Sequence, residues 1–479
     1  MPSPTTSPRL TNMRSVLRSR TTPLIVATAL LMENIDATVL STSLPQIAAD
    51  LNTDPIHLKL ALTSYLLALA VFIPASGWAA DRFGVRRVFR LAIITFALGS
   101  VACAMAPTLG TLILARIAQG IGGSMMVPVG RLIVLRAVPK AGLVNALAWL
   151  TVPALIGPVL GPPLGGFITT YADWRWIFWI NIPIAILGVS LVTRFIPKLP
   201  PVAVPTFDAR GFWLIGPGLA MFLSGITIAG LGLAPVPLLV ALIGTGAALT
   251  LAYVRHARIT PAPLVDLRLL RIPTFRVATI GGTLFRVGGG ALPFLLPLMF
   301  QIGFGLSAFQ SGMMTFATGI GAMLMKFIAQ PILRRFGFRR VLVVNAALAA
   351  LMLLAPAGFT PQTPYLLMIA TLFVGGICRS LQFTAINAIA YSDVEPPQMG
   401  SATSFNSVLQ QLSASMGITL AAFGLEAMQG IYGGAAIDID HFPAVFAMLA
   451  LVSVSSTIWF LRLTPTAGAS VLARDPARA

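Results

Sequence analysis

The sequence predicts an all-α membrane protein with two matched bundles of six transmembrane helices and two further helices inserted between them. Three observations support this fold class: long apolar runs, the placement of the basic residues and a repeated basic loop. Of the 479 residues, 57% are hydrophobic and 10% are charged. A soluble domain usually has about 25% charged residues. Most of the chain is therefore expected to lie within a lipid bilayer.

Apolar runs long enough to span a bilayer, which takes about 20 residues each, recur fourteen times along the chain. Their number is even, so the two termini are expected on the same side. The predicted spans are Pro23–Leu44, Leu58–Ala80, Val88–Met105, Leu109–Val134, Leu143–Thr169, Trp176–Ile196, Phe212–Leu231, Val236–Val254, Val277–Phe304, Gln310–Leu333, Val341–Phe359, Pro364–Tyr391, Ala402–Met428 and Phe442–Leu463.

The basic residues give this topology an orientation. With the N-terminus in the cytoplasm, the cytoplasmic segments hold 26 of the 32 Lys and Arg, whereas the outer segments hold only Lys59 and Arg175. Basic residues are enriched in cytoplasmic loops, so both termini are predicted to be cytoplasmic, in a multi-pass protein of the bacterial inner (plasma) membrane. One cytoplasmic loop departs from the pattern, because it has Asp393 and Glu395 and no basic residue.

A short basic loop occurs twice. The segment Ala80–Val88 (ADRFGVRRV) returns 253 residues later as Leu333–Val341 (LRRFGFRRV), with six of nine residues identical. One copy per half indicates a duplicated secondary transporter. Six spans with their loops occupy roughly 200 residues, so the surplus of about 50 predicts two inserted helices. The expected organisation is a cytoplasmic arm (1–22), a first bundle (23–196), a linker with two inserted helices (197–276), a second bundle (277–463) and a cytoplasmic tail (464–479).

The residue pattern argues against other classes of protein. The net charge of +18 lies in short clusters between apolar runs and not in a basic–aromatic module, so no nucleic-acid partner is expected. Cys103 and Cys378 lie within apolar runs and suggest neither a disulfide framework nor a metal site. No nucleophile–base pair shares a span and His57, His256 and His441 lie at or beyond span ends, so we expect neither enzymatic activity nor a cofactor.

The first copy of the repeat resembles the loop signature of the major facilitator superfamily. Asp81 can favour the positive N-terminal end of the next helix, Gly84 permits a tight turn, and the arginines hold the loop at the cytoplasmic face. A basic loop that only sets topology is the alternative. The second copy has Arg334 in place of Asp81 and is a degenerate partner. In Gly77–Arg87 the matching positions are Gly77, Asp81, Arg82, Gly84, Arg86 and Arg87.

The fifth span contains GPVLGPPLGG (Gly157–Gly166), which resembles the antiporter signature of that superfamily. Glycines every four residues leave one helix face without side chains, so that a neighbouring helix can approach closely. The prolines remove backbone donors and let the helix bend. A packing groove without bearing on the direction of exchange is the alternative. The motif positions are Gly157, Pro158, Gly161, Pro162, Gly165 and Gly166.

Two acids and one arginine lie deep in the first half. Leu114–Gly123 (LARIAQGIGG) resembles the fourth-span motif of the superfamily, and Arg116 within it is expected to line a cavity or meet a carboxylate. Glu33 and Asp36 are three residues apart and share a helix face. The block Met32–Leu40 (MENIDATVL) resembles the one that opens the fourteen-span drug:proton antiporters, and it implies proton coupling through Asp36, with Glu33 and Arg116 nearby.

The resemblance extends over nearly the whole chain, including Trp174–Pro183 and Gln301–Gly312. The blocks Met125–Arg131 and Phe336–Val344 look most like the MdtD-type and HsrA-type exporters within this EmrB/QacA-like subfamily. Polar side chains in other spans could face a substrate cavity or make interhelical hydrogen bonds. The cavity candidates are Gln119, Arg286, Gln301, Asn406 and Gln410. Lys326 and Arg379 could also line the cavity, bind an anionic group or snorkel to an interface, and snorkelling is favoured for Lys326 because it lies close to a cytoplasmic end.

The resemblance implies a monomeric proton-coupled transporter that exports drugs or other small lipophilic or amphipathic compounds, with small-molecule substrate, protons and lipid as its partners. No phosphate-binding G-x-x-x-x-G-K-[ST] motif is present, so an ion gradient would supply the energy, or transport is passive. The alternatives are a proton-coupled transporter of a specific endogenous metabolite or siderophore and a membrane sensor or scaffold. The intramembrane charges argue against a scaffold, which has no reason to bear their cost.

Overall fold

The computed structural model describes residues 8–137, 143–197, 206–229, 234–395, 398–432 and 437–468, with the backbone alone at 8–20, 137 and 143–155. All regular structure in these ranges is helical. The α-helices are α1 (Pro8–Asp50), α2 (Lys59–Phe83), α3 (Val85–Ala104), α4 (Leu109–Ala137), α5 (Leu143–Tyr171), α6 (Trp176–Trp179), α7 (Asn181–Phe195), α8 (Ala209–Ile228), α9 (Val236–Ile259), α10 (Pro273–Leu298), α11 (Ala308–Phe336), α12 (Phe338–Leu354), α13 (Tyr365–Ala390), α14 (Met399–Tyr432) and α15 (Phe442–Phe460).

Thirteen described helical segments are long and apolar enough to cross a membrane, with α6 and α7 together forming one of them. The 29-residue α5 lies between the fourth and fifth of these segments. At 1.5 Å per residue it is about 43 Å long, more than the roughly 30 Å of a bilayer core. The prediction of an all-α membrane protein with about fourteen spans is therefore confirmed. One boundary differs, since α1 begins at Pro8, within the expected N-terminal arm.

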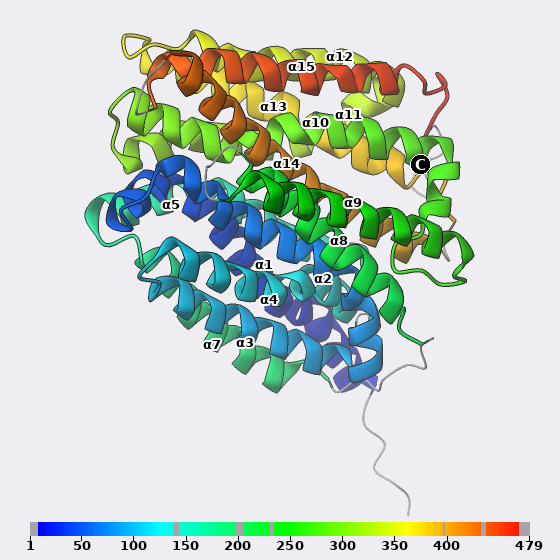
Figure 1. Ribbon diagram of the computed structural model, residues 1–479. Helices are drawn as coiled ribbons and strands as arrows, with labels where there is room; N and C mark the ends of the chain where they lie inside the picture. Colours follow the sequence, from blue (N-terminus) through cyan, green and yellow to red (C-terminus); the bar gives the residue numbers. More distant parts are fainter. Residues whose placement is uncertain are drawn as a thin grey trace, which may run out of the picture.

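Figure 1 shows the two groups of helices side by side, with α1–α5 and α7 in one and α10–α15 in the other. The hairpin of α8 and α9 lies across the front, at the boundary between the groups. Glycines allow its helices to pack closely, since a Cβ on Gly218 would lie 3.0 Å from Thr250 Oγ1. The hairpin touches both groups: the rings of Phe72 (α2) and Phe212 (α8) are 5.6 Å apart, and Thr227 (α8) hydrogen-bonds Thr419 (α14) at 2.9 Å.

The repeated loop has the same backbone geometry in both copies. Gly84 and Gly337 have φ of 88° and 73°, values that favour glycine because it has no Cβ. The equivalent arginines also have equivalent partners: Arg86 donates to the carbonyl of Thr193 near the end of α7, and Arg339 donates to the carbonyl of Leu461 after α15. The third and sixth spans of each half are thus joined in the same way.

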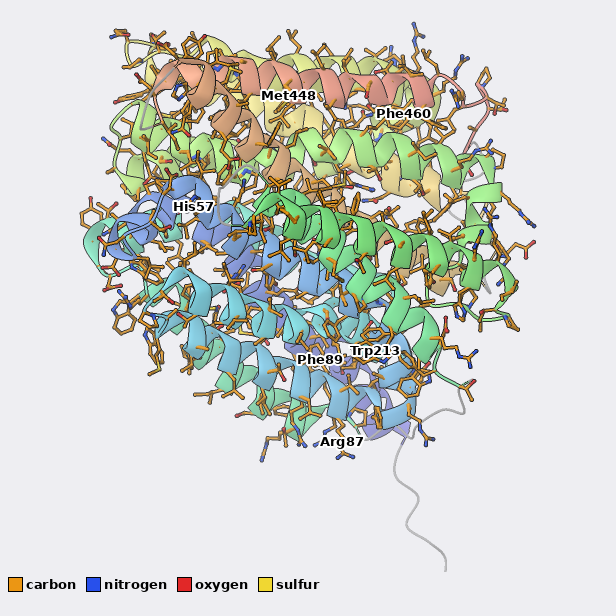
Figure 2. All side chains as sticks on the ribbon, viewed as in Figure 1. His57, Arg87, Phe89, Trp213, Met448 and Phe460 are labelled. Atoms are coloured by element: carbon orange, nitrogen blue, oxygen red, sulfur yellow. The ribbon has the colours of Figure 1, made fainter. Side chains whose placement is uncertain are left out.

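Asp81 has a different partner from the one expected. Its carboxylate forms an ion pair with Arg136 in the last turn of α4, because Asp81 still belongs to α2 and faces that neighbour. The loop motif therefore ties the second span to the fourth and the third span to the sixth. Figure 2 shows His57, before α2, and Arg87, just after the turn, at opposite ends of the first group of helices.

Candidate functional site

The deep carboxylate of the first half lies in a closed hydrogen-bonded cluster. Arg116 Nη1 (α4) donates to Asp36 Oδ2 (α1) at 2.7 Å. Asp36 Oδ1 accepts from Gln119 Nε2 at 2.8 Å and from Asn181 Nδ2 (α7) at 2.9 Å. Ser100 (α3) accepts from both amides, at 2.7 and 3.2 Å. Asp36 is 3% exposed, so four helices enclose a carboxylate that accepts hydrogen bonds from three side chains.

Arg116 makes further hydrogen bonds and a cation–π contact. Its Nη1 also donates to Gln119 Oε1 at 2.5 Å, and its Nε donates to the carbonyl of Ala61 at 3.3 Å. The guanidinium carbon lies 4.2 Å from the ring centroid of Tyr65, a cation–π contact. A buried arginine is tolerated when such partners replace water. We name the set Asp36, Arg116, Gln119, Asn181 and Ser100 the acid cluster.

Two members of the acid cluster were not among the candidates from sequence. Asn181 lies in Trp174–Pro183, a stretch that entered the sequence analysis only as part of the family resemblance. Ser100 looks like an ordinary small residue of a span. The one signal in the sequence was a polar amide at the start of an apolar span, and the structure shows that Asn181 is 0% exposed. Gln119, a candidate for the substrate cavity, belongs to the acid cluster.

Glu33 lies one helical turn before Asp36 on α1 but outside the acid cluster. It is 8% exposed, and its Oε2 has no hydrogen-bond partner among the residues described. A buried carboxylate without donors is stable mainly in its protonated form. The first span therefore places two acids in different surroundings, one surrounded by donors and one without them.

The glycines of the antiporter motif let α5 lie directly on α1. A Cβ on Gly157 would lie 2.6 Å from Cβ of Asn34, and one on Gly161 would overlap Thr38 Oγ1. Gly165 in turn faces the backbone of Val39. Asn34 and Thr38 lie on the face of α1 opposite Asp36, because residues two apart on a helix point about 200° apart.

The same motif brings α5 against the second half. Gly166 lies against the carbonyl of Ala308, at the start of α11. Gly312 of α11 lies against the carbonyl of Pro162, and a Cβ on Gly319 would be 2.9 Å from Cα of Val159. Thus α5 contacts one helix of each half through faces that have little or no side chain.

A cavity of about 250 Å³ lies between the two halves, next to this contact. We name it the central cavity. Thr38 and Ser41 of α1 and Pro158 and Pro162 of α5 line its first-half wall, so both the acid-bearing helix and the antiporter motif border it. The other lining residues are Val159, Gly289, Leu292, Pro293, Leu296, Pro297, Thr315, Thr318, Gly319, Ala322, Met323, Lys326 and Arg379.

The remaining cavity candidates lie elsewhere. Arg286 donates to Asn406 Oδ1 at 3.2 Å and to Asn387 Oδ1 at 3.0 Å, and Gln410 also donates to Asn387 at 3.4 Å. Gln301 donates to the carbonyl of Thr42 at 2.8 Å and so joins the two halves. Within the described lining, the charged residues of the central cavity are instead Lys326 and Arg379.

The comparisons with known proteins agree with this architecture. The family model described as Major Facilitator Superfamily matches residues 26–418 and 278–478. The chain is 40% identical, over 446 residues, to the "Putative multidrug resistance protein MdtD" of Salmonella heidelberg strain SL476 and equally to that of Salmonella typhimurium strain LT2. Each match covers 92% of this chain and 94% of the relative.

Solved structures of the same fold are more distant in sequence. A D-xylose–proton symporter superposes with a TM-score of 0.68 at 15% identity and covers 94% of this chain and 98% of its own. An auto-inhibited POT family peptide transporter gives 0.65 at 16% identity, with 93% and 97% covered. The family match, the relatives and the two groups of helices around a central cavity establish that this chain belongs to the major facilitator superfamily.

Proposed function

We propose that this protein exports small amphipathic compounds across the bacterial inner membrane in exchange for protons, and that Asp36 is the proton carrier. The observation that supports this most is the acid cluster: a buried carboxylate, 3% exposed, paired with Arg116 at 2.7 Å. Intramembrane acids are costly and mark proton or ion pathways. A transporter needs such a group where protonation can change the contacts between helices.

Protonation of Asp36 would weaken the contact between α1 and α4. The charged carboxylate accepts hydrogen bonds from Arg116, Gln119 and Asn181, which come from α4 and α7. Neutralising one partner of a buried ion pair leaves the other uncompensated, and breaking such a pair costs about 3–5 kcal/mol. The proton would therefore shift the balance between two arrangements of α1.

The same helix would transmit this change to the substrate. Asp36 is on the α4 side of α1, whereas Thr38 and Ser41 line the central cavity. A small rotation or translation of α1 would alter both sites at once, since Asp36, Thr38 and Ser41 lie on the same helix. A membrane potential supplies about 2.3 kcal/mol per charge per 100 mV for the inward movement of each proton.

The experiment is transport in proteoliposomes with an imposed pH gradient, across a panel of cationic, neutral and anionic compounds. The wild type should move at least one compound against its gradient, and a protonophore should abolish that movement. Asp36→Asn should lose gradient-driven transport and keep measurable binding, because the cavity is intact. Asp173→Asn, an exposed carboxylate that pairs with Arg175 at 3.4 Å, is the matched control and should keep the wild-type rate. A wild-type rate in Asp36→Asn would refute the proposal.

A further inference from the structure

We infer that the central cavity selects amphipathic organic anions, with the acidic group of the substrate held by Arg379 and Lys326. This inference rests on the proposed function, because it names the substrate class of the same cavity. It starts from two cations that the described part of the protein does not neutralise. Both lie on the second-half wall of the cavity, on helices that pack against each other.

Arg379 lies near the middle of α13, about 21 Å along the helix from its first residue, Tyr365. No ion pair or hydrogen bond of its guanidinium is found among the described residues. The aliphatic part of its side chain lies beside Gly289 of α10, where a Cβ would be 3.2 Å from Arg379 Cδ. An arginine without a partner at this depth is costly, so an anion from outside the protein would lower its free energy.

Lys326 extends the positive charge along α11. It lies on the same helix face as Thr315, Ala322 and Met323, all of which line the cavity. Its Nζ donates to Thr384 Oγ1 at 3.0 Å, a neutral partner. Lys326, for which snorkelling to an interface is the favoured expectation, is exposed and lies on the cavity wall.

Within the described residues, no acid neutralises this charge. From Leu267 to Ser392 the sequence contains no aspartate or glutamate, so α10–α13 contain no carboxylate. Of the two deep acids of the first half, Asp36 is paired with Arg116, and neither Asp36 nor Glu33 lines the cavity. The lining of the cavity includes no acidic side chain either. A cationic substrate would meet two like charges, which is unfavourable.

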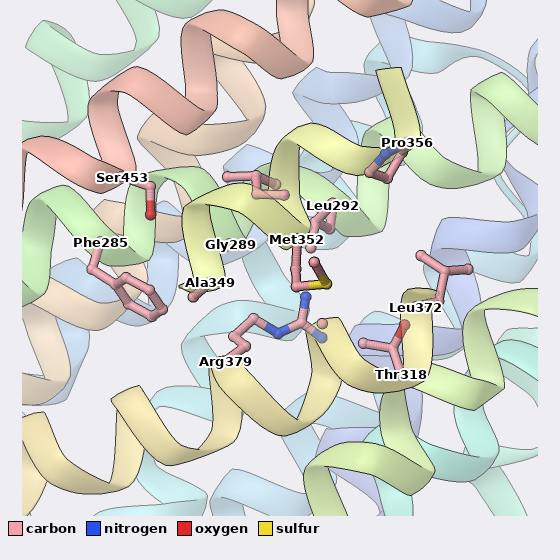
Figure 3. A pocket seen from close by; sticks show the side chains of 12 residues that line it. Phe285, Gly289, Leu292, Thr318, Ala349, Met352, Pro356, Leu372, Arg379 and Ser453 are labelled. Atoms are coloured by element: carbon pink, nitrogen blue, oxygen red, sulfur yellow. The ribbon is translucent and has the colours of Figure 1, made fainter. Parts of the chain in front are cut away.

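The rest of the cavity suits a small apolar body. Leu292, Leu296 and Met323 line it together with several prolines, and Thr38 and Ser41 add hydroxyl groups to its wall. A smaller pocket of about 30 Å³ adjoins it, and Gly289, Leu292, Thr318 and Arg379 line both. Figure 3 shows the guanidinium of Arg379 extending into this pocket beside Met352. The anionic group would bind at this border, with its apolar part in the larger space.

The charge of the substrate sets the electrical behaviour of the exchange. An anion that leaves while a proton enters moves net positive charge inward, whatever the number of protons. A monovalent cation exchanged for one proton moves none. An inside-negative potential should therefore accelerate export of the anion even without a pH gradient.

The test uses three dansyl compounds that differ mainly in charge: dansylglycine (anion), dansylglycinamide (neutral) and dansylcadaverine (cation). Binding to the purified full-length protein in phosphatidylcholine nanodiscs is followed by fluorescence anisotropy. We expect dansylglycine to bind at least about tenfold more tightly than the other two, the effect of one charge-assisted hydrogen bond. Equal binding of the three, or preference for the cation, would overturn the inference.

Substitutions then assign the preference to the two cations. Arg379→Gln and Lys326→Gln should each remove about tenfold or more of the affinity for dansylglycine and leave dansylglycinamide unchanged. Arg379→Lys should retain part of the preference. Arg335→Gln, at the end of α11, is the control and should bind all three like the wild type. If Arg379→Gln does not fold, Lys326→Gln and the wild-type selectivity decide the question.

Two further experiments distinguish a substrate from a lipid headgroup as the bound anion, and failure of the substrate class from failure of the proton mechanism. Nanodiscs containing phosphatidylglycerol should not weaken dansylglycine binding; competition would assign the cations to a lipid headgroup and overturn the inference. If Asp36→Asn abolishes gradient-driven transport but the compounds transported are cations, the substrate class is wrong and the proton mechanism holds. If Asp36→Asn keeps the wild-type rate while dansylglycine is still preferred, the proton mechanism fails alone.

Discussion

Lys59 Nζ lies 2.7 Å from Glu426 Oε1, so an ion pair joins the start of α2 to the end of α14. The lysine is 0% exposed, and the charge pattern of the sequence places it on the outer side. The pair connects the two halves at the end where Gly166 and Ala308 also meet. The predicted outer face is thus closed by one ion pair and by direct backbone contact.

Breaking this ion pair should open the outer face. Lys59→Met leaves Glu426 without its partner, and losing one partner of a buried pair costs about 3–5 kcal/mol. Spin labels at Met105 and Tyr365, exposed residues near the predicted outer ends of α3 and α13, report the separation of the halves after both native cysteines are replaced. Pulsed electron resonance should show a longer distance in Lys59→Met. The control is Arg175→Met, which breaks the ion pair of Arg175 with Asp50 within the first half and should leave the distance unchanged. An unchanged distance distribution in Lys59→Met would show that the Lys59–Glu426 pair does not hold the outer face closed.

The two first-span acids should have separable roles. Two carboxylates about one helical turn apart do not both ionise at low cost, so one should keep its proton while the other exchanges. Among the described residues Glu33 Oε2 has no hydrogen-bond partner, whereas Asp36 has three donors. We expect Glu33→Gln to shift the pH optimum of transport without abolishing it. Loss of transport in Glu33→Gln, with a wild-type rate in Asp36→Asn, would reverse the assignment.

Asn181 should tune the pH dependence of transport. Its amide donates to Asp36 at 2.9 Å, and Asn181→Leu removes one of the donors that stabilise the charged carboxylate. The transport profile should therefore move to higher pH, which a series of proteoliposome assays between pH 5 and pH 9 measures. Asn345→Leu is a matched control, since this buried amide bonds Gln382 in the second half. A shift of the pH profile by the same amount in Asn181→Leu and Asn345→Leu would indicate a general effect of removing a buried amide.

Gly161 should tolerate no side chain. A Cβ there would overlap Thr38 Oγ1, so Gly161→Ala must push α5 away from α1. Overpacking of this kind costs about 1–3 kcal/mol, and thermal unfolding in detergent should show a lower midpoint. Gly244→Ala on α9 has no atom within 4 Å of the added Cβ and should be neutral or stabilising. Equal midpoints in the two variants would mean that α5 can withdraw at no cost.

Reporter fusions test the orientation. The charge asymmetry places Lys198 and Arg258 in the cytoplasm and Arg175 outside. Fusions of a periplasm-active and a cytoplasm-active reporter at these positions should therefore give the same side for the first two and the opposite side for the third. Opposite sides for Lys198 and Arg258 would exclude an inserted pair of helices.

The sequence was sufficient for the helices, because apolar runs determine spans where a backbone in lipid must satisfy its own hydrogen bonds. The scarcity of deep charges left Glu33 and Asp36 as the possible acidic partners of Arg116, and the structure pairs it with Asp36. The rotation of each helix was harder to predict. Whether Lys326 and Arg379 face the cavity or the lipid depends on packing between helices far apart in sequence, and fully apolar spans carry little periodic signal.

The amide side chains that bond Asp36 and Arg286 could not be assigned from the sequence either. Asn181, Asn387 and Asn406 each look like isolated polar residues in a span, and only the fold brings them to Asp36 or Arg286. A polar residue in a span has many possible partners, and the unfolded chain in the membrane finds some of them too. Its role therefore cannot be assigned before the neighbouring helices are in place.

The bare faces of α5 have a kinetic consequence. Helices normally pack with ridges of side chains in the grooves of their neighbours, so sliding one past another requires many rotamers to change together. Where Gly157, Gly161 and Gly165 meet α1 and Gly312 and Gly319 meet α5, one of the two surfaces has no ridge. Sliding along these contacts crosses a smoother energy profile, with fewer barriers from interlocking side chains. The friction that limits the rate of conformational exchange should then arise elsewhere, in the interdigitated contacts of the other helices.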